Sequence, residues 1–302
     1  MEVEKPRIMQ KFVPNTLDDS RIPVTIKVHK NRNEYIKVDD YWIRNFGKPD
    51  VDIRDLNNLY DKDDLKNIVA NEIRNTKFNH PEIANETFSF NKVLIVSDGF
   101  NFHQHKDVFP ELSEDTCVIA VNQALRLWQS IVFPEYYLIC NTTDAAMSYL
   151  PKKQFPKLIA SRRTYHNFVK NYRNIIYLYD PSPDFTYQSP YTKEALLLVD
   201  DYRNPICAAI GLAYFMKASK IFLAYCSHAY KEPRDGTEKL EEGIYQYPQQ
   251  RLGDKIVDGN LLWYRENFPD VSIYHTGIKN SFMFAKYLSS SEFTDKLIYE
   301  QE

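Results

Sequence analysis

Polar residues that could bind a ligand or move a proton follow the ends of several apolar segments of this chain. Ser97-Asp98-Gly99 follows KVLIV, Asn122 follows TCVIAV, and Ser227-His228 follows IFLAYC. Apolar runs of this length are typical of strands that are covered on both faces of a parallel sheet. Because the carboxyl ends of parallel strands meet at one edge, we expect these side chains to lie where open α/β sheets bind ligands.

The residue types at this edge favour recognition of a polar ligand together with one proton transfer. Asparagine carries both a donor and an acceptor, which suits the edge of a base or a ribose better than acid–base chemistry. Asn122 and Asn141 are the two candidates of this kind. His228 is the candidate general base, because histidine titrates near neutral pH, although a histidine in a polar loop more often has no catalytic role.

Three other clusters are open to a functional and to a simpler interpretation. Arg162-Arg163 could clamp a phosphate bidentately or be a solvated pair. His103 and His105 could bind a metal, but without a third ligand they are better interpreted as loop histidines. Asp200-Asp201 is more simply a solvated acidic pair than a cation site. The sequence contains no GxGxxG, Walker or GxSxG motif, so dinucleotide and P-loop sites lose their main support.

Composition indicates a globular protein. The 302 residues are 43% hydrophobic and 26% charged, enough for one large core and a smaller appendage. The net charge of −3 argues against a general nucleic-acid binder. No apolar run approaches ~20 residues, and the charged start MEVEKPRIMQ lacks a signal-peptide core. We therefore expect a cytoplasmic protein without a transmembrane segment, with peripheral membrane contact and oligomeric state left open.

The cysteines support this expectation. None of them has the CxxC spacing of a zinc or redox site, and each falls in an apolar segment, so we expect all to be reduced and buried. They are Cys117, Cys140, Cys207 and Cys226.

The chain divides at about residue 90 into two parts that differ in their pattern of polar and apolar residues. Residues 1–90 are polar and are predicted to be an N-terminal extension or small appended module. There, residues 24–28 form a possible edge strand, residues 35–38 could pair with it, and residues 61–77 have the periodicity of a helix.

Residues 91–302 alternate apolar strands with helices, which predicts an α/β fold with a doubly wound, mainly parallel Rossmann-like sheet. A helix is expected to begin at Asn204, a good N-cap, with Pro205 at its first position. The predicted strands are residues 92–96, 116–121, 134–140, 157–160, 175–179, 221–226 and 271–274.

The order of these segments resembles a domain family that joins archaeal 6-hydroxymethylpterin pyrophosphokinases, flagellin glycosyltransferases and small bacterial sialyltransferases. The resemblance spans about residues 92–288. It rests on KVLIVSDGFNF, CVIAVNQALRLW, PEYYLICNTTD and NPICAAIGLAYFMKASKIFLAYCSHAY. Three elements depart from the family pattern: Ser97-Asp98-Gly99 replaces a Gly-Pro-Ser turn, Asn204-Pro205 replaces Ser-Gly, and the acidic residue often found after the late strand is replaced near His228.

The resemblance implies first a glycosyltransferase-like enzyme that uses a nucleotide-activated sugar, with a CMP-nonulosonate as the candidate, on a glycan or protein hydroxyl. The nucleotide would be held by Ser97, Asp98, Gly99, Asn122 and Asn141, with the helix start at Asn204 near its phosphate. In this hypothesis His228 deprotonates the acceptor, and Tyr179 or Tyr187 stabilises the leaving phosphate.

Two alternatives remain open at this stage, because a fold does not determine a function. One is pyrophosphoryl transfer to a small alcohol with magnesium held by Asp98 and Asp144. The other is a non-catalytic binding or structural protein that retains the fold. The nucleotide-sugar would be a co-substrate, no firm cofactor is implied, and magnesium belongs only to the first alternative.

Overall fold

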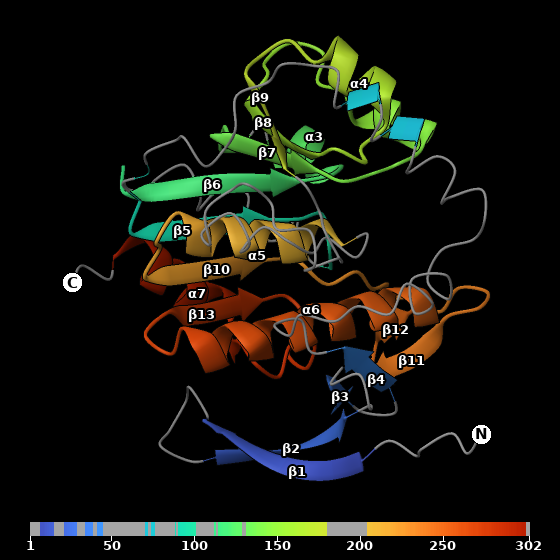
Figure 1. Cartoon of the computed structure of the whole chain (residues 1–302), viewed down its shortest axis with the longest axis vertical. Helices are drawn as coiled ribbons and strands as arrows, with labels where there is room; N and C mark the ends of the chain where they lie inside the picture. Colours follow the sequence, from blue (N-terminus) through green and yellow to red (C-terminus); the bar gives the residue numbers. More distant parts are fainter. Residues whose placement is uncertain are drawn as a thin grey trace.

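The chain forms an eight-stranded parallel sheet covered by helices, and a separate four-stranded sheet (Figure 1). The computed structural model describes residues 70–71, 74–75, 88, 90–100, 112, 114–128, 131–179 and 204–299, and the backbone of strands 7–14, 21–28, 34–38 and 41–44. Every pairing in the large sheet is parallel. The predicted α/β Rossmann-like class is therefore confirmed.

The seven predicted strands are all present. They are β5 (Lys92–Val96), β6 (Thr116–Val121), β7 (Tyr136–Ile139), β8 (Lys157–Ser161), β9 (Ile176–Tyr179), β10 (Lys220–Ala224) and β13 (Ser272–Thr276). An eighth, β14 (Lys286–Tyr287), was not predicted.

The helical elements are α3 (Ala124–Trp128), the 3-10 helix η4 (Asp144–Tyr149), α4 (His166–Asn171), α5 (Pro205–Phe215), α6 (Pro248–Asn267) and α7 (Ser290–Ile298). Sequence analysis located α5, whereas η4, α4, α6 and α7 were not predicted. A hairpin of β11 (Glu238–Glu241) and β12 (Ile244–Gln246) precedes α6. None of the helices in the described part of the chain is long and apolar enough to cross a membrane.

The strand order places a topological switch point in the middle of the sheet. The order is β14-β13-β10-β5-β6-β7-β8-β9. From β5 the chain adds β6 to β9 outward on one side, and α5 then returns it to β10 on the other side of β5. The connections after β5 and β10 therefore diverge, and the crevice beyond their carboxyl ends is where such sheets bind ligands.

Two apolar cores lie on opposite faces of the sheet, because successive residues of a strand point to opposite sides. Val93 and Ile95 of β5 face the core built with α5 and α6. Leu94 and Val96 face the core built with α3, α4 and α7. All four cysteines are free and buried, which confirms that prediction.

The N-terminal strands β1 (Arg7–Pro14), β2 (Arg21–Val28), β3 (Glu34–Val38) and β4 (Tyr41–Arg44) form the smaller, antiparallel sheet. The predicted pairing of residues 24–28 with 35–38 is confirmed. The expectation of an edge strand there is wrong, because β2 lies between β1 and β3. The division into an extension or appended module of residues 1–90 and a domain of residues 91–302 stays a prediction.

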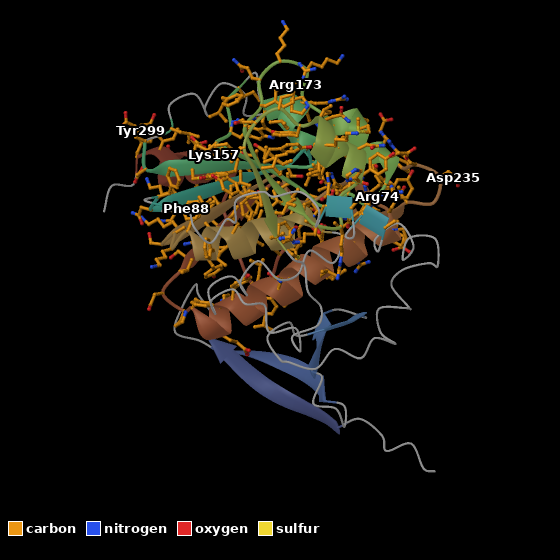
Figure 2. All side chains as sticks on the ribbon, turned by 45° about the horizontal axis from the view of Figure 1, so that its top comes forward. Arg74, Phe88, Lys157, Arg173, Asp235 and Tyr299 are labelled. Atoms are coloured by element: carbon orange, nitrogen blue, oxygen red, sulfur yellow. The ribbon has the colours of Figure 1, made fainter. Side chains whose placement is uncertain are left out.

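A short helical segment before residue 90 is hydrogen-bonded to the large sheet's loops. Residues 70–71 and 74–75 are helical, as predicted, and the rest of the predicted helix lies outside the described residues. Asn71 Nδ2 donates to the carbonyl oxygens of Thr142 and Arg163. Asn75 Nδ2 donates to those of Arg162 and Thr164, both at 2.8 Å. Arg74 marks this segment in Figure 2.

We expect Asn75→Ala to destabilise the protein by roughly 2–6 kcal/mol. Asn75 is fully buried, so its removal leaves two loop carbonyls unsatisfied, at about 1–3 kcal/mol each. Urea unfolding of Asn75→Ala and Asn171→Ala checks this, since Asn171 is exposed and donates only within α4. Similar losses in both variants would contradict a role for Asn75 in holding these loops.

Candidate functional site

A cleft with two chambers opens at the carboxyl ends of β5 and β10. The chambers share Asp98, Gln123, His228 and Gln250. The outer chamber, of about 740 Å³, is lined by these and by Gly99, Phe100, Leu127, Ala229, Tyr230, Lys231, Glu232, Pro233 and Arg234. The inner chamber, of about 220 Å³, adds Ser97, Val121, Asn122, Tyr149, Asn204, Pro205, Ile206, Cys226, Gly253 and Asp254.

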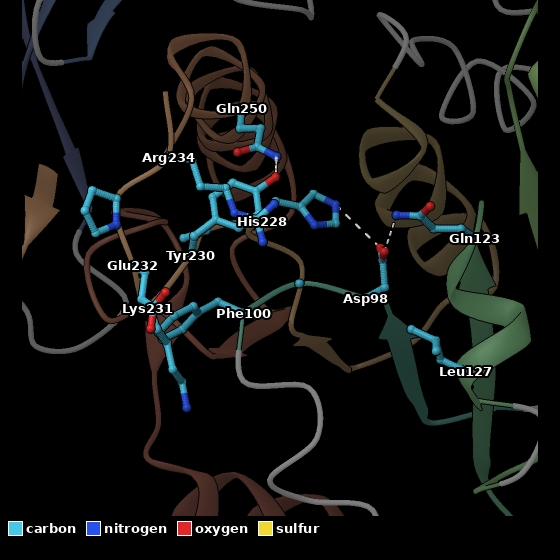
Figure 3. Close-up of a pocket in the computed structure, with 13 residues that line it drawn as sticks. Asp98, Phe100, Gln123, Leu127, His228, Tyr230, Lys231, Glu232, Arg234 and Gln250 are labelled. Carbon is cyan, nitrogen blue, oxygen red and sulfur yellow. Dashed lines mark hydrogen bonds and ion pairs between the residues drawn. The ribbon is translucent and has the colours of Figure 1, made fainter. Parts of the chain in front are cut away.

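An acid–histidine pair stands where the two chambers meet (Figure 3). His228 Nε2 lies 3.6 Å from Asp98 Oδ1, and Gln123 Nε2 donates to Asp98 Oδ2. The two residues follow β5 and β10, the strands that flank the switch point. A carboxylate near one ring nitrogen favours the tautomer that carries its proton there, and in that tautomer the other nitrogen, Nδ1, can accept a proton.

The 97–99 turn is fixed by the neighbouring chain and does not form a cradle of free N–H groups. The N–H of Ser97 donates to Ala224 O, that of Gly99 to Tyr225 O and that of Phe100 to Ser227 O. A Cβ on Gly99 would lie 2.2 Å from the carbonyl oxygens of Tyr225 and Ser227. Gly99 is therefore required by the close approach of two backbones.

Gly99→Ala is expected to destabilise the fold by about 1–3 kcal/mol or more, because the clash is with backbone and cannot relax by a rotamer change. Thermal unfolding of Gly99→Ala and Gly253→Ala provides the comparison. In Gly253→Ala the new methyl would meet only the Asn204 side chain, at an ordinary contact of 3.7 Å within α6. A Gly99→Ala protein as stable as Gly253→Ala would refute the steric argument.

Asn122 lines the inner chamber from the residue directly after β6. Its backbone is in the left-handed region, with φ of 45°, a conformation that asparagine tolerates better than most residues. Its side-chain Oδ1 is buried and accepts no hydrogen bond within the described part of the chain. An amide in this position is available to a ligand.

The start of α5 also lines the inner chamber, but its first N–H groups are already used. Asn204 Oδ1 accepts from the N–H of Ile206, its carbonyl accepts from Cys207, and Pro205 has no N–H. Asn204 Nδ2 donates to Gly253 O. The predicted N-cap is confirmed. Because the N–H groups named here already have acceptors, they are not free to bind the phosphate that was expected at this turn.

Several predicted residues lie away from the two chambers. Asn141 lines neither of them, and its Oδ1 accepts from the N–H and hydroxyl of Thr143. Tyr179 is a core residue at the end of the edge strand β9, because its ring packs in the α5–α6 core. Asp144 is exposed and lines neither chamber. Tyr187, His103, His105 and Asp200-Asp201 lie outside the described residues.

Asp254 is a buried acid in the inner chamber that sequence analysis missed. Its side chain comes from α6, is 7% exposed, and its Oδ2 accepts from Ser227 Oγ at 2.5 Å and Gln246 Nε2 at 2.7 Å. Burial raises the pKa of Asp254 to about 7, although both hydrogen bonds oppose the shift. At neutral pH this carboxyl can gain or lose a proton.

A sequence signal for this acid was present. Pro248 suits the first position of a helix, and residues 248–267 contain Val257, Leu261 and Leu262, which are buried on one side. Asp254 and Asp258 lie one turn apart on the same helix, both buried. Two acids on the core side of an amphipathic helix are unusual, and that pattern could have identified α6 as part of the site.

The cationic side chains of the cleft belong to the outer chamber. Lys231 and Arg234 line it, whereas no lysine or arginine lines the inner chamber in the described structure. The Arg234 guanidinium lies 3.8 Å from the centre of the Tyr230 ring, and Tyr230 Oη accepts from Gln250 Nε2. Among the described residues, no group of three acids, histidines or cysteines is placed to hold a metal ion.

Comparison with known proteins gives a fold relation. The structure is similar to one described as the MAf glycosyltransferase from Magnetospirillum magneticum AMB-1, with a TM-score of 0.54 and 12% sequence identity. The chain shares its fold with a glycosyltransferase. The match covers 76% of this chain and 38% of that one, so this chain spans well under half of its structural neighbour. No family model matches the chain, and no curated protein matches it.

Proposed function

We propose that this protein is a glycosyltransferase-like enzyme that moves a sugar from a nucleotide-activated donor to a hydroxyl acceptor. The observation that carries the proposal is the Asp98–His228 pair, at 3.6 Å, in a cleft at the switch point of the sheet. The shared fold with a solved glycosyltransferase supports it. A CMP-nonulosonate as donor and a glycan or protein as acceptor are the finer form of the proposal.

The proposed reaction uses His228 as the base. Nδ1 takes the proton of the acceptor hydroxyl as its oxygen bonds to the anomeric carbon of the donor sugar. The bond from that carbon to the nucleotide phosphate breaks, and its electron pair leaves with the phosphate. Asp98 holds the proton on Nε2 and stabilises the imidazolium that forms.

The charge distribution supports one orientation of the donor. The phosphate would lie in the outer chamber, near Lys231 and the guanidinium that is stacked on Tyr230. Asp98 lines both chambers, but in the outer one Lys231 and Arg234 offset Asp98 and Glu232. The inner chamber adds Asp254 and has no lysine or arginine, so it suits an uncharged polar group better than an anion. This orientation replaces the expectation that the start of α5 or Tyr179 meets the phosphate.

The magnesium-dependent alternative gains no specific support. Asp98 is already engaged by His228 and Gln123, and Asp144 lines neither chamber. A thermal-shift comparison of CMP, UDP, GDP and ATP, each with and without magnesium, separates the hypotheses. A nucleotide at 100 times its dissociation constant should stabilise the protein by about 2.7 kcal/mol. Stabilisation by none of them would refute the proposal.

Asn122→Ala is expected to weaken binding of the stabilising nucleotide by about 1–3 kcal/mol, the cost of leaving a buried polar partner unpaired. Asn141→Ala is the matched control, since Asn141 follows the next strand, β7, but lies outside both chambers. Isothermal titration calorimetry of the two variants checks this prediction. Equal weakening in both would show that the ligand extends beyond the cleft described above, and no change in either would exclude Asn122 as a contact.

A further inference from the structure

Asp254 is connected to His228 through a short hydrogen-bond chain. We propose that Asp254 is a positioning residue for His228, acting through Gln246 and Ser227; this inference rests on the proposed function of the cleft. Gln246 Nε2 donates both to the His228 carbonyl, at 2.9 Å, and to Asp254 Oδ2, at 2.7 Å. Ser227 Oγ donates to the same carboxylate oxygen at 2.5 Å. One buried oxygen therefore fixes two consecutive residues of the loop after β10.

The loop that carries His228 is thus held from two sides. On the side-chain side, the imidazole meets Asp98 from β5. On the main-chain side, Gln246 at the end of β12 donates to the His228 carbonyl, and Asp254 of α6 in turn accepts from Gln246. Gln246 is buried, so its amide has no water to replace these partners. Loss of the Asp254 carboxylate leaves Gln246 and Ser227 without their shared acceptor, so the main-chain side of His228 is held less firmly.

The charged groups around Asp254 make the anchor sensitive to pH. Lys255 favours its ionised form, and Asp258, one turn along α6, disfavours it. From the opposite wall, Asp98 and His228 line the same chamber. The ionised carboxylate is the better acceptor for Ser227 and Gln246, so protonation weakens both hydrogen bonds. A carboxyl with a pKa of about 7 then links the placement of His228 to physiological pH.

NMR titration of the full-length protein tests the inference without any substrate. In protein labelled with ¹³C-histidine, the ring signal of His228 is assigned by its loss in His228→Gln and followed from about pH 4.5 to pH 9. In wild type we expect a second inflection, from Asp254, in addition to any protonation of the ring. Asp254→Asn should lose the second inflection. Asp258→Asn is the matched control: this buried acid of α6 accepts from Phe284 N–H and raises the pKa of Asp254, so the variant should retain the second inflection and move it to lower pH.

Gln246→Met distinguishes positioning through the hydrogen-bond chain from a direct electrostatic effect of the Asp254 charge on His228. It removes the link to His228 O but keeps the Asp254 carboxyl, so positioning predicts that the second inflection weakens here too. Identical His228 curves in wild type, Asp254→Asn and Gln246→Met would overturn the inference. Loss of the second inflection in Asp254→Asn with its full retention in Gln246→Met would also overturn it, in favour of a through-space effect.

Kinetics with a sugar donor that carries the nucleotide found to stabilise the protein provide the second readout. Asp254→Asn should lower kcat about 10-fold, part of the ~10²–10⁴-fold that a positioned base supplies, with KM within about twofold of wild type. A rise in KM alone would overturn positioning and make Asp254 a binding contact. If no protein transfers a sugar, the proposed function fails, and the NMR curves still decide the link between Asp254 and His228.

Discussion

His228→Ala is expected to lower turnover by about 10²–10⁴-fold while leaving nucleotide affinity within about threefold of wild type. The reason is geometric: the imidazole faces the shared zone of both chambers, and in the proposed reaction it acts on the acceptor. Asp98→Asn should cause a smaller loss of turnover, because the amide no longer stabilises the imidazolium that Nδ1 creates.

Single-turnover kinetics and calorimetry, run on both variants and on His166→Ala, check this prediction. His166 begins α4 and contacts Asn75, outside the cleft, so its removal should leave turnover of the folded protein unchanged. If His228→Ala weakens nucleotide binding as much as turnover, His228 is a ligand contact and another group is the base. Unchanged turnover would remove the catalytic assignment altogether.

Replacing His275 and replacing Asp254, two buried titratable residues, are expected to change the pH dependence of the free energy of unfolding in opposite directions. Burial lowers the pKa of His275 to about 4, and both of its ring nitrogens lack a hydrogen-bond partner within the described structure. Between pH 6.5 and about 4 the unfolded chain binds a proton at His275 that the folded protein does not. Folded-state stability therefore falls as the pH falls through this window, by about 3 kcal/mol at ~1.4 kcal/mol per pKa unit.

Asp254 has the reverse effect, because its pKa is raised from 3.8 to about 7. Between these values the folded protein holds a proton that the unfolded chain has lost, so stability falls as the pH rises, by about 4 kcal/mol. In wild type the two contributions largely cancel between pH 4 and pH 6.5. Each single variant should expose the other residue's contribution.

Urea unfolding from pH 4 to pH 8 measures this. Relative to wild type, Asp254→Asn should gain stability as the pH rises, whereas His275→Leu should gain it as the pH falls. Leucine suits the site, since the imidazole packs between the rings of Phe282 and Tyr287. The double variant should show the sum of the two single curves. A difference from wild type that does not change with pH, in either single variant, would contradict the assigned burial effect.

Much of the sheet could be predicted from sequence, because buried strands of a parallel sheet are short, apolar and bounded by polar residues. KVLIV and TCVIAV coincide with β5 and β6. The strand β14 was missed because Lys286 and Tyr287 form only two residues of strand, too few to show a pattern. Helix α6 was missed because its apolar positions are interrupted by Asp254, Asp258 and Lys255, charged residues that are buried in the fold.

The site could be predicted only in part, for a related reason. Position after a strand correctly indicated which residues reach the sheet edge, and Asp98 and His228 follow adjacent strands. Asn141 follows β7 and Tyr179 ends β9, yet both strands lie farther from the switch point, and neither residue lines the cleft. Asp254 reaches the cleft from a helix, and no rule about strand ends could find it.

The central place of β5 has a consequence for how the chain acquires its structure. One edge of β5 pairs with β6, the next strand in sequence, but the other edge pairs with β10, and Ser219 meets Asn91 across a separation of 128 residues. During synthesis, β5 to β9 emerge first and leave an apolar strand with an open edge until β10 follows. Such an edge pairs readily with another nascent chain. We therefore expect folding to be slow and sensitive to protein concentration, with chaperones acting before α5 has returned the chain to the middle of the sheet.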